Sequence, residues 1–570
     1  MSRRLKTRLL FSIFLVFIFL LAITVWYSPV LLKGYSSQPM GYGILIARNY
    51  SQSDVFGMED NLNIFVAPSL VEERANTSTV SNKFTYYSYG YLFKAIGQLS
   101  INQLLITSFI LHALALVLFT VLIFYLFGSS IALVFPFIYI FFPFQWQHSQ
   151  FLATYEFALF YLSLFSLFYF WGRDQKLKII YLVLAGFFLS LTVMSRETFM
   201  MFLPLFFIYL VFHKKKLEIL SVFIPLALML LVFWAPSFLS QENSNLYLFK
   251  TGASEELKSP AYHLYGHLYA DPYTYHFAKG DADQELEQQI TNTDSDFATV
   301  LGRLKVGANI GERSIGFGER LLVGSNIFLK HMSRFLAIEA IGGPLITLLM
   351  LLGLYKLKYI SKELFQFFIF WMIGVLFLLS YLGLSTRNRL IDFGWVIALL
   401  VSLGLSSIFL LLKDYFKLKR FLWPIYIIVV LLVVYNLVIA SHVFWGRAYD
   451  DKDNLAAIYI GEQIKQSEVA DDEIIATSFR EGHVLFNYLA EKSFVYFSPE
   501  TTDRLIAEGE LQSAFDKFGV KYIVGFHEDQ SVKILEQTSV INISSAPAED
   551  ELVKPTDVYT NEMWFLNLVK

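Results

Sequence analysis

The sequence predicts an all-α polytopic membrane bundle of about eleven transmembrane helices, with a small extracytoplasmic α/β domain at its C-terminal end. Three observations lead to this fold class. The 570 residues are 55% hydrophobic and only 16% charged, against roughly 25% charged residues in soluble domains. Apolar stretches long enough to cross a bilayer recur along the chain. Basic residues gather in the short connectors on one side of these stretches, and the long polar segments fall on the other side.

A hydrocarbon core about 30 Å thick requires about 20 apolar residues per helix. The first candidate stretch follows the basic segment MSRRLKTR and lacks a small-x-small cleavage site, so we expect a retained helix. The fifth and sixth stretches are joined only by Ser195–Thr198, and the sequence leaves open whether they are two helices. The stretches are residues 9–27, 103–126, 130–146, 154–171, 179–195, 198–212, 219–238, 334–354, 364–385, 390–412 and 421–445.

Lysine and arginine predict the orientation of these helices. With the N-terminus in the cytoplasm, the cytoplasmic connectors carry 17 basic residues and the short outer connectors carry 3. This asymmetry follows the positive-inside rule. It predicts a multi-pass protein of the cell (inner or plasma) membrane with a cytoplasmic N-terminus and an extracytoplasmic C-terminus. The cytoplasmic basic residues are assigned no chemistry beyond topology.

The sequence predicts two domains. Residues 1–445 form a transmembrane module with long outer loops at 28–102 and 240–333, and residues 446–570 form a soluble extracytoplasmic α/β domain. Short β-branched and aromatic runs in the second domain predict strands, and the helical patterns between them indicate a βαβ arrangement. The predicted strands are Ile474–Thr477, Phe494–Phe497 and Tyr522–Phe526, and the predicted helices are Gly482–Ala490 and Thr502–Phe518.

Composition excludes several kinds of chemistry. The chain has no cysteine, so disulfides, thiolate metal sites and a cysteine nucleophile are excluded. A net charge of −3 gives no indication of nucleic-acid binding. The pairs Asp281/Asp283 and Asp294/Asp296 have the D-x-D spacing of metal–nucleotide sites, but their Gln-, Thr- and Gly-rich surroundings favour a solvated loop. A divalent metal is compatible with the chain, although no residue cluster indicates one.

Ionisable residues beside the predicted helices are the strongest functional indication, because a charge at the bilayer centre costs about 2.5–3.5 kcal/mol. Glu156 opens the fourth stretch, shortly after His148. Arg196 lies at the outer end of the fifth stretch, and Arg387 and Arg389 lie at the outer start of the tenth. Arginines at this depth can hold a phosphate by bidentate hydrogen bonds. They can equally form local ion pairs with neighbouring acids, so both interpretations stay open.

The first outer loop adds two groups of residues. The acids that can act as a base are Asp54, Glu59 and Asp60. An aromatic run ahead of the second stretch contains Tyr86, Tyr87 and Tyr89. An interfacial tyrosine belt is one interpretation of this run. The other interpretation is contact with a sugar or an acceptor, together with His148 and Glu156.

These features resemble the GT-C glycosyltransferases, in particular bacterial membrane proteins related to the protein O-mannosyltransferases and the aminoarabinose transferases. The resemblance covers most of the chain through individually loose motifs. They are Ala47–Asn49 (ARN), the Tyr86–Tyr91 run, Pro143-Phe144, Ser195–Thr198 (SRET) ahead of Pro204, the RNRLIDFGW segment at 387–395, and Phe518–Val524 (FGVKYIV).

The resemblance implies transfer of a sugar from a polyprenyl-phosphate donor to an acceptor outside the cytoplasm. It implies that an acid of the first outer loop serves as general base or orients the acceptor. Arginines would hold the donor phosphate, here Arg196, Arg387 and Arg389. The family's acid usually stands directly after the first helix, where this chain has Ser37–Tyr42 and no carboxylate. Either Asp54, Glu59 or Asp60, further along the loop, supplies this carboxylate, or the chemistry of this protein differs from that of the family.

Two other function classes stay open. One is a non-catalytic or transport protein of envelope polysaccharide assembly, although the inverted repeats typical of transporters are not evident. The other is an adhesion or structural protein in which residues 446–570 do the work. The Trp-Trp-Asp sequence of oligosaccharyltransferases is absent. The expected partners are the sugar-carrying polyprenyl phosphate, an extracytoplasmic acceptor and membrane lipids, and not nucleic acid.

Overall fold

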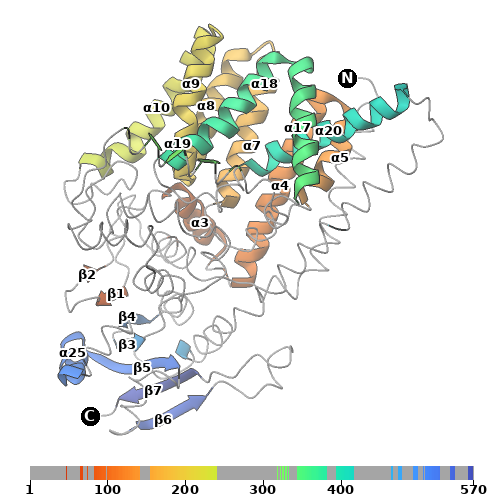
Figure 1. Ribbon diagram of the computed structural model, residues 1–570. Coiled ribbons are helices and arrows are strands. Elements are labelled where there is room, and N and C mark those ends of the chain that lie inside the picture. The colour runs from red at the N-terminus through yellow and green to blue at the C-terminus, as the bar shows by residue number, and fades with distance from the viewer. Residues whose placement is uncertain are drawn as a thin grey trace. The chain divides into compact units, whose positions relative to one another are not determined.

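The computed structural model describes residues 64–67, 73–74, 83–97, 101–140, 155–239, 343–381, 393–415, 474–477, 492–497, 507–526, 540–545 and 563–568, with isolated residues between them. These residues are mostly helical and include one seven-stranded sheet (Figure 1). The chain forms two compact units. Unit 1 consists of Met1–Phe19, His112–His148 and Ala158–Ser441, and unit 2 of Leu20–Leu111, Ser149–Phe157 and His442–Lys570.

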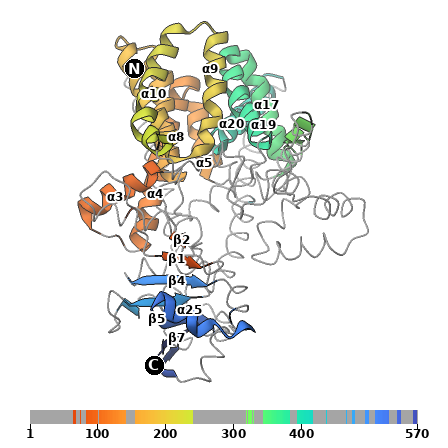
Figure 2. The same ribbon diagram turned by 90° about the vertical axis from the view of Figure 1, so that its left-hand side faces the viewer.

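The helices of unit 1 follow the apolar stretches of the sequence. They are α4 (Ile101–Phe127, whose N-terminal part belongs to unit 2), α5 (Ser129–Ile140), α7 (Tyr155–Gly172, whose first turn belongs to unit 2), α8 (Lys178–Ser195), α9 (Phe202–Phe212), α10 (Lys216–Leu239), α17 (Pro344–Ile360), α18 (Lys362–Ile369), α19 (Val375–Tyr381) and α20 (Gly394–Tyr415). A 3₁₀ segment, η2 (Glu197–Met201), joins α8 to α9, and a π segment, η5 (Phe370–Gly374), joins α18 to α19. Figure 2 shows α8, α9 and α10 in yellow beside α17 and α20 in green.

The helices have the length and surface of a membrane protein. Within the described residues, Ile106–Phe127, Lys178–Ser195 and Lys216–Phe233 are long and apolar enough to cross a membrane. The apolar side chains that α10 exposes recur at helical spacing, at Leu217, Leu220, Ile224, Leu228 and Leu231. A helix that is apolar on its exposed face as well as its buried face is suited to a lipid environment. The chain is therefore a membrane protein with a helical bundle.

Nine of the eleven predicted stretches coincide with described helices, whereas 9–27 and 421–445 lie outside the described residues. The number eleven and the sidedness of the termini stay predictions. α17 begins at Pro344, ten residues later than predicted. Gly343 precedes it with φ 87°, a conformation that suits glycine, and proline is favoured in the first turn of a helix.

The connector between the fifth and sixth stretches is a true break. The chain leaves the helical conformation at Arg196, which is extended (φ −153°, ψ 114°). The backbone N–H of Arg196 still donates to the carbonyl oxygen of Thr192 (3.0 Å) and completes α8. η2 then leads the chain into α9. The two stretches are therefore two helices, and Arg196 stands at the corner between them.

Aromatic side chains fill much of the interior of unit 1. Phe202 lies against Trp371, with ring centroids 4.3 Å apart, and Phe119 stacks on Trp395 at 4.6 Å. Phe367 packs edge-to-face against Trp371 at 5.5 Å. Trp371 and Trp395 meet edge-to-face at 5.5 Å, so these contacts join α4, α9, α18, η5 and α20 into one packed core.

Glycines bring α17 and α20 into backbone contact. A methyl group added at Gly353 would lie 1.7 Å from the carbonyl oxygen of Leu400. One added at Gly404 would lie 2.0 Å from the carbonyl oxygen of Leu349. Such close approach of small residues is how helices associate in lipid, where burial of apolar surface gives little driving force.

Unit 2 contains the sheet, whose strand order is β2-β1-β4-β3-β5-β7-β6. The inner strands β1, β4, β3 and β5 are parallel neighbours, and β2, β7 and β6 pair antiparallel toward the two edges. The strands are β1 (Ile64–Ala67), β2 (Glu73–Arg74), β3 (Ile474–Thr477), β4 (Ser493–Phe497), β5 (Val520–Phe526), β6 (Val540–Ser545) and β7 (Met563–Leu568).

The three strands predicted for the C-terminal segment are confirmed as β3, β4 and β5, and their parallel pairing agrees with a βαβ arrangement. Of the predicted helices, 482–490 lies outside the described residues. The other is divided, because Gly509 (φ 69°) interrupts it: Leu505, Ala507 and Glu508 are helical before the break, and α25 covers Leu511–Phe518 after it. The sequence did not predict β6, β7 or the two strands of the first outer loop. The boundary at residue 446 lies outside the described residues and stays a prediction.

Candidate functional site

The residues that the sequence proposes for a site fall into two groups. Asp54, Glu59, Asp60, His148, Arg387 and Arg389 lie outside the described residues. Tyr86 belongs to helix α3 (Lys83–Ile96), and only its backbone is described. Tyr87, Tyr89 and Glu156 are described in unit 2, and Arg196 is described in unit 1. The roles assigned to all of them stay predictions.

Helix α3 buries the tyrosine run inside unit 2. The exposed fractions of Tyr87 and Tyr89 are 7% and 1%, whereas Tyr91 is 47% exposed. The ring of Tyr89 lies 6.4 Å from that of Phe93 and meets Phe157 edge-to-face at 4.9 Å. An interfacial belt presents its rings to lipid headgroups. That interpretation is wrong for Tyr87 and Tyr89, whose side chains pack inside the protein.

Glu156, in the first turn of α7, is the buried acid beside Tyr89, with 1% of its surface exposed. Burial, and after it the charge of Glu156, raise the pKa of Tyr89 well above its ordinary value. The Tyr89 hydroxyl is therefore neutral, and it has no hydrogen-bond partner among the described residues. A carboxylate that accepts and a phenol that donates are a combination able to bind the hydroxyl groups of a sugar.

Arg196 is the buried cation at the end of α8, with 7% of its surface exposed. Its corner position arises because the chain is extended at this residue and resumes a helical path in η2, where the backbone N–H of Phe199 donates to the Arg196 carbonyl oxygen (3.2 Å). A buried charge requires acceptors around it. The guanidinium offers five donors in a planar fork, which matches the oxygens of a phosphate.

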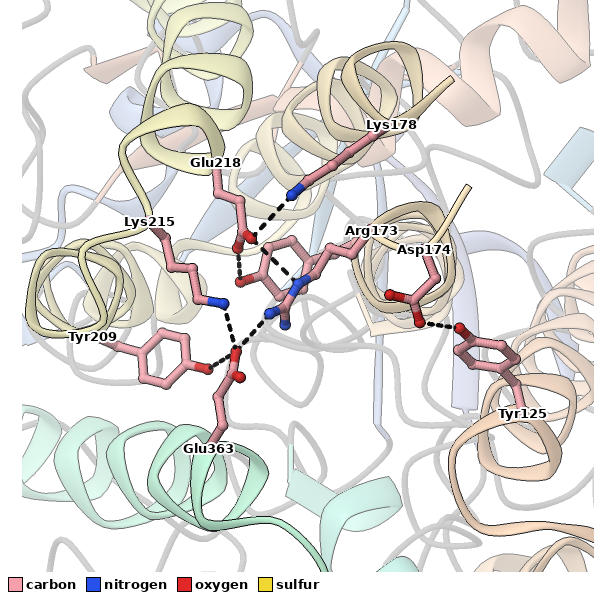
Figure 3. Close-up of polar contacts among 9 residues, drawn as sticks. Tyr125, Arg173, Asp174, Lys178, Tyr209, Lys215, Glu218 and Glu363 are labelled. Carbon is pink, nitrogen blue, oxygen red and sulfur yellow. Dashed lines mark hydrogen bonds and ion pairs between the residues drawn. The ribbon is translucent and has the colours of Figure 1, made fainter. Parts of the chain in front are cut away.

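A polar network joins three connectors at the opposite end of α8, and Figure 3 shows it converging on Arg173. Arg173 Nη2 donates to Glu363 Oε1 (2.6 Å), and its Nε lies 3.3 Å from Glu218 Oε1. Lys178 lies 3.7 Å from the Glu218 carboxylate, and Lys215 lies 3.5 Å from that of Glu363. The network therefore links the α7–α8, α9–α10 and α17–α18 connectors, which we call the connector clamp.

Two tyrosines complete the connector clamp. The Tyr169 hydroxyl donates to Glu218 Oε2 (2.8 Å), and the Tyr209 hydroxyl donates to Glu363 Oε1 (3.1 Å). The Arg173 guanidinium also lies 5.4 Å above the centre of the Tyr169 ring, a cation–π arrangement. Each carboxylate thus accepts a hydrogen bond from a tyrosine and forms an ion pair with the shared arginine, which offsets the cost of burying Glu218 (2% exposed).

The clamp holds the Glu363 carboxyl group in its ionised form. Partial burial by itself would raise the pKa of Glu363. The hydrogen bond and charge of Arg173, followed by the charge of Lys215, outweigh burial, and the pKa lies below its ordinary value. This network was not predicted from the sequence. In the sequence, the only indication is that Glu218 and Glu363 each closely follow basic residues of a connector. Which of these charges pair depends on the tertiary structure.

Within the described part of the chain, no group of three or more His, Asp and Glu residues could hold a metal ion. Among the described candidate residues, unit 2 contains the buried acid Glu156 and Tyr89, and unit 1 contains the buried Arg196.

Comparison with known proteins finds solved structures of similar fold, but no matching family model or curated sequence. No protein-family model matches the chain, and no curated protein sequence matches it. The apo structure of the oligosaccharyltransferase from Archaeoglobus fulgidus is similar at a TM-score of 0.50 and 15% identity, over 91% of this chain and 69% of that one. The structure of the same enzyme tethered to an acceptor peptide is similar at a TM-score of 0.50 and 14% identity, over 89% of this chain and 69% of that one.

ArnT from Cupriavidus metallidurans bound to undecaprenyl phosphate gives a TM-score of 0.46 and 10% identity, over 97% of this chain and 98% of that one. The oligosaccharyltransferase is a GT-C glycosyltransferase. The sequence resemblance to the GT-C glycosyltransferases is therefore confirmed at the level of the fold.

Proposed function

We propose that the protein is a membrane glycosyltransferase that moves a sugar from a polyprenyl-phosphate-linked donor to an extracytoplasmic acceptor, a glycan, a lipid or a protein. The observation that carries the proposal is the likeness to the Archaeoglobus fulgidus oligosaccharyltransferase along nine-tenths of the chain. That enzyme has been captured with an acceptor peptide. A fold hosts many functions, so the support that is specific to this chain comes from its own charged residues.

The transfer requires a base on one side of the anomeric carbon and a stabilised leaving group on the other. The nucleophilic atom of the acceptor attacks the anomeric carbon, and the bond from this carbon to the phosphate oxygen breaks. We assign the base that takes the acceptor proton to one of Asp54, Glu59 and Asp60. We assign the departing polyprenyl phosphate to the guanidinium groups of Arg196, Arg387 and Arg389, which hold phosphate oxygens by charge-assisted hydrogen bonds.

The pairing of Tyr89 with Glu156 supports a contact to a sugar or to the acceptor. The two groups are buried together, one able to donate and the other able to accept. We assign this contact role to Tyr86, Tyr87, Tyr89, His148 and Glu156. The geometry favours Tyr89 and Glu156 within this set, because their side chains are buried next to each other in unit 2.

Single alanine substitutions of Asp54, Glu59 and Asp60 test the assignment of the base. Loss of a general base typically lowers the rate about 10²–10⁴-fold, and we expect that loss for one of the three in a glycan-transfer assay on membranes. Asp281→Ala, in an acidic pair assigned to a solvated loop, is the matched control and should keep full transfer. Full transfer by all three variants would refute the assignment.

A transport protein of envelope assembly is the competing function, and liposomes containing the purified protein separate the two. A transferase releases polyprenyl phosphate and forms a glycosylated acceptor. A transporter moves a fluorescent polyprenyl-phosphate sugar across the bilayer and forms no product.

A further inference from the structure

The end of unit 1 that carries the connector clamp has a surplus of positive charge. All three acids of its connectors are engaged by the protein itself. Glu218 and Glu363 lie in the clamp, and Asp174 accepts a hydrogen bond from the Tyr125 hydroxyl. The remaining basic side chains therefore have no carboxylate of these connectors to neutralise them. The connectors contain eight basic and three acidic residues, within 173–178, 214–218 and 358–363.

Five lysines at this end form what we call the lysine rim. Their side chains are exposed, and none of them forms an ion pair within the part of the chain that the structure describes. Lys178 and Lys215 are less exposed and pair with the carboxylates of the clamp (Figure 3). Two lysines thus neutralise the clamp, whereas the charge of the rim is available to a ligand. The rim consists of Lys176, Lys214, Lys216, Lys358 and Lys362.

Helix packing brings the rim together. Lys178, at the start of α8, lies 3.7 Å from Glu218 in the first turn of α10. About two turns further along α8, a methyl group added at Gly186 would lie 2.3 Å from the carbonyl oxygen of Val222 in α10. The two helices therefore run side by side in the same direction, and their starts lie together. The Glu363 carboxylate of the clamp ties the α17–α18 connector to the same place.

Exposed aromatic and apolar side chains beside the rim mark the level of lipid headgroups. Near the end of α17, Tyr355 and Tyr359 are 61% and 71% exposed, and their hydroxyls lie 2.9 Å apart. Tyrosines in this position are typical of the boundary between hydrocarbon and headgroups. Leu177, Phe212 and Leu217 are exposed within two residues of a lysine of the rim. Such a mixture fits a surface that meets acyl chains and charged headgroups at once.

Lys214 has a backbone conformation that suits glycine. Its φ is 54°, in the left-handed region, and it follows α9 at the position where helices commonly end on glycine. The Lys214 N–H donates to the Val211 carbonyl oxygen (2.9 Å), and the next N–H donates to the Leu210 carbonyl oxygen (2.9 Å). These bonds hold the turn without the Lys214 side chain, which is exposed. Lysine therefore brings to this position a positive charge rather than a favourable backbone.

We propose that the lysine rim binds the phosphate groups of anionic phospholipids in the leaflet at this end of the bundle. The proposal does not depend on the transfer reaction. Clusters of about four to eight basic residues beside membrane helices are typical sites for anionic headgroups, and lysine stems pack along apolar surface while the ammonium groups reach the phosphate. The neighbouring tyrosines and apolar side chains favour a lipid over an acidic protein. The clamp contributes by keeping the nearby carboxylates paired, so that they do not repel the phosphate.

Local quenching by labelled lipids tests the proposal in the full-length protein, because the chain has no native cysteine. A fluorophore on Leu177→Cys, beside the rim, is exposed in liposomes to nitroxide-labelled phosphatidylglycerol or to nitroxide-labelled phosphatidylcholine. At equal mole fraction we expect phosphatidylglycerol to quench at least about fivefold more effectively, the factor that one lysine near an anionic surface gives. Equal quenching by the two lipids would overturn the proposal, and it is the result expected of a surface for an acidic protein.

Leu228→Cys is the matched control for the position of the label. It is exposed on α10, about three turns beyond the rim, and should show no preference between the two lipids. A preference as large at Leu228→Cys as at Leu177→Cys would overturn the assignment to the rim.

Variants of charge separate electrostatics from packing. In Lys176→Gln/Lys214→Gln/Lys216→Gln, the preference at Leu177→Cys should be lost, because the label site then has no free cation of α8 or α10 beside it. The three corresponding arginine substitutions keep the charge and should keep the preference. A loss as large with arginine as with glutamine would overturn the role of charge.

Lys214→Gly distinguishes lipid binding from a structural role of this residue. Glycine suits a φ of 54°, so the melting temperature in detergent should not fall, whereas the preference for phosphatidylglycerol should decrease. A lower melting temperature with an unchanged preference would mean that Lys214 serves the turn and not the lipid.

Discussion

At the residue scale, the buried charges differ in how visible they are in the sequence. Glu156 and Arg196 can be identified from the sequence alone, because each is a charged residue at the end of an apolar stretch, and both prove to be buried. The partners of Arg173 cannot be identified in this way. Glu363 is 190 residues further along the chain, and the two meet only when the helices have packed.

Removal of Arg173 should be costly. The Arg173→Ala variant leaves Glu218, 2% exposed, with one partner fewer in the interior. Breaking a buried ion pair in this way costs about 3 kcal/mol. Arg173→Lys should recover only part of the lost stability, because an ammonium group lacks the planar fork that reaches both carboxylates. Unfolding in detergent measures the effect, and the exposed Lys176→Ala is the control. Equal stability of Arg173→Ala and wild type would show that the connector clamp is dispensable.

The stability of the clamp should depend on pH. Because the pKa of Glu363 is lowered in the folded protein, its ionised form adds stability above about pH 4.3, the ordinary pKa of glutamate. That contribution is lost as the pH falls through the lowered value. Glu363→Gln should therefore be less stable than wild type at neutral pH, and the difference should shrink in acid. The exposed Glu508→Gln is the control, and a difference that grows in acid would contradict the sign of this effect.

At the scale of elements, the sequence predicts helices and strands whose signal is local. The apolar stretches need only composition and length, and β3, β4 and β5 are apparent from their aromatic and β-branched runs. β1 and β2 were missed because both are short, and because β1 pairs with β4 in a distant part of the chain. Arg196 and Gly509 show a second limit, since single residues decide where a helix breaks.

The contact between α17 and α20 should fail when either glycine acquires a side chain. A methyl group at Gly353 meets the Leu400 carbonyl oxygen at 1.7 Å, and one at Gly404 meets that of Leu349 at 2.0 Å. Backbone cannot yield without separating the helices, so each alanine variant should lose at least about 2 kcal/mol of stability. Thermal unfolding measures this loss.

Gly374→Ala is the matched control for these variants. Its methyl group would meet the Cδ1 atom at the end of the Leu205 side chain at 2.7 Å, and a side-chain end can rotate away. A loss as large for Gly374→Ala as for Gly353→Ala would mean that backbone contact is not the cause.

At the scale of the whole molecule, a membrane bundle and a mixed sheet combine in a chain with the GT-C fold. The fold class was predictable because membrane helices and basic connectors leave a strong pattern in composition. The pairing of the first outer loop with the C-terminal strands was less predictable, because β1 and β4 lie far apart in the sequence.

The most direct test of the central claim is sugar transfer by the purified protein in liposomes. A panel of polyprenyl-phosphate sugars labelled in the sugar is supplied with extracytoplasmic acceptor material, and released polyprenyl phosphate and labelled acceptor are both measured. We expect acceptor-dependent release with one of the donors, reduced at least about 100-fold in Arg196→Ala because the leaving phosphate loses its buried cation. Movement of the labelled lipid across the bilayer, with no release from any donor, would contradict it.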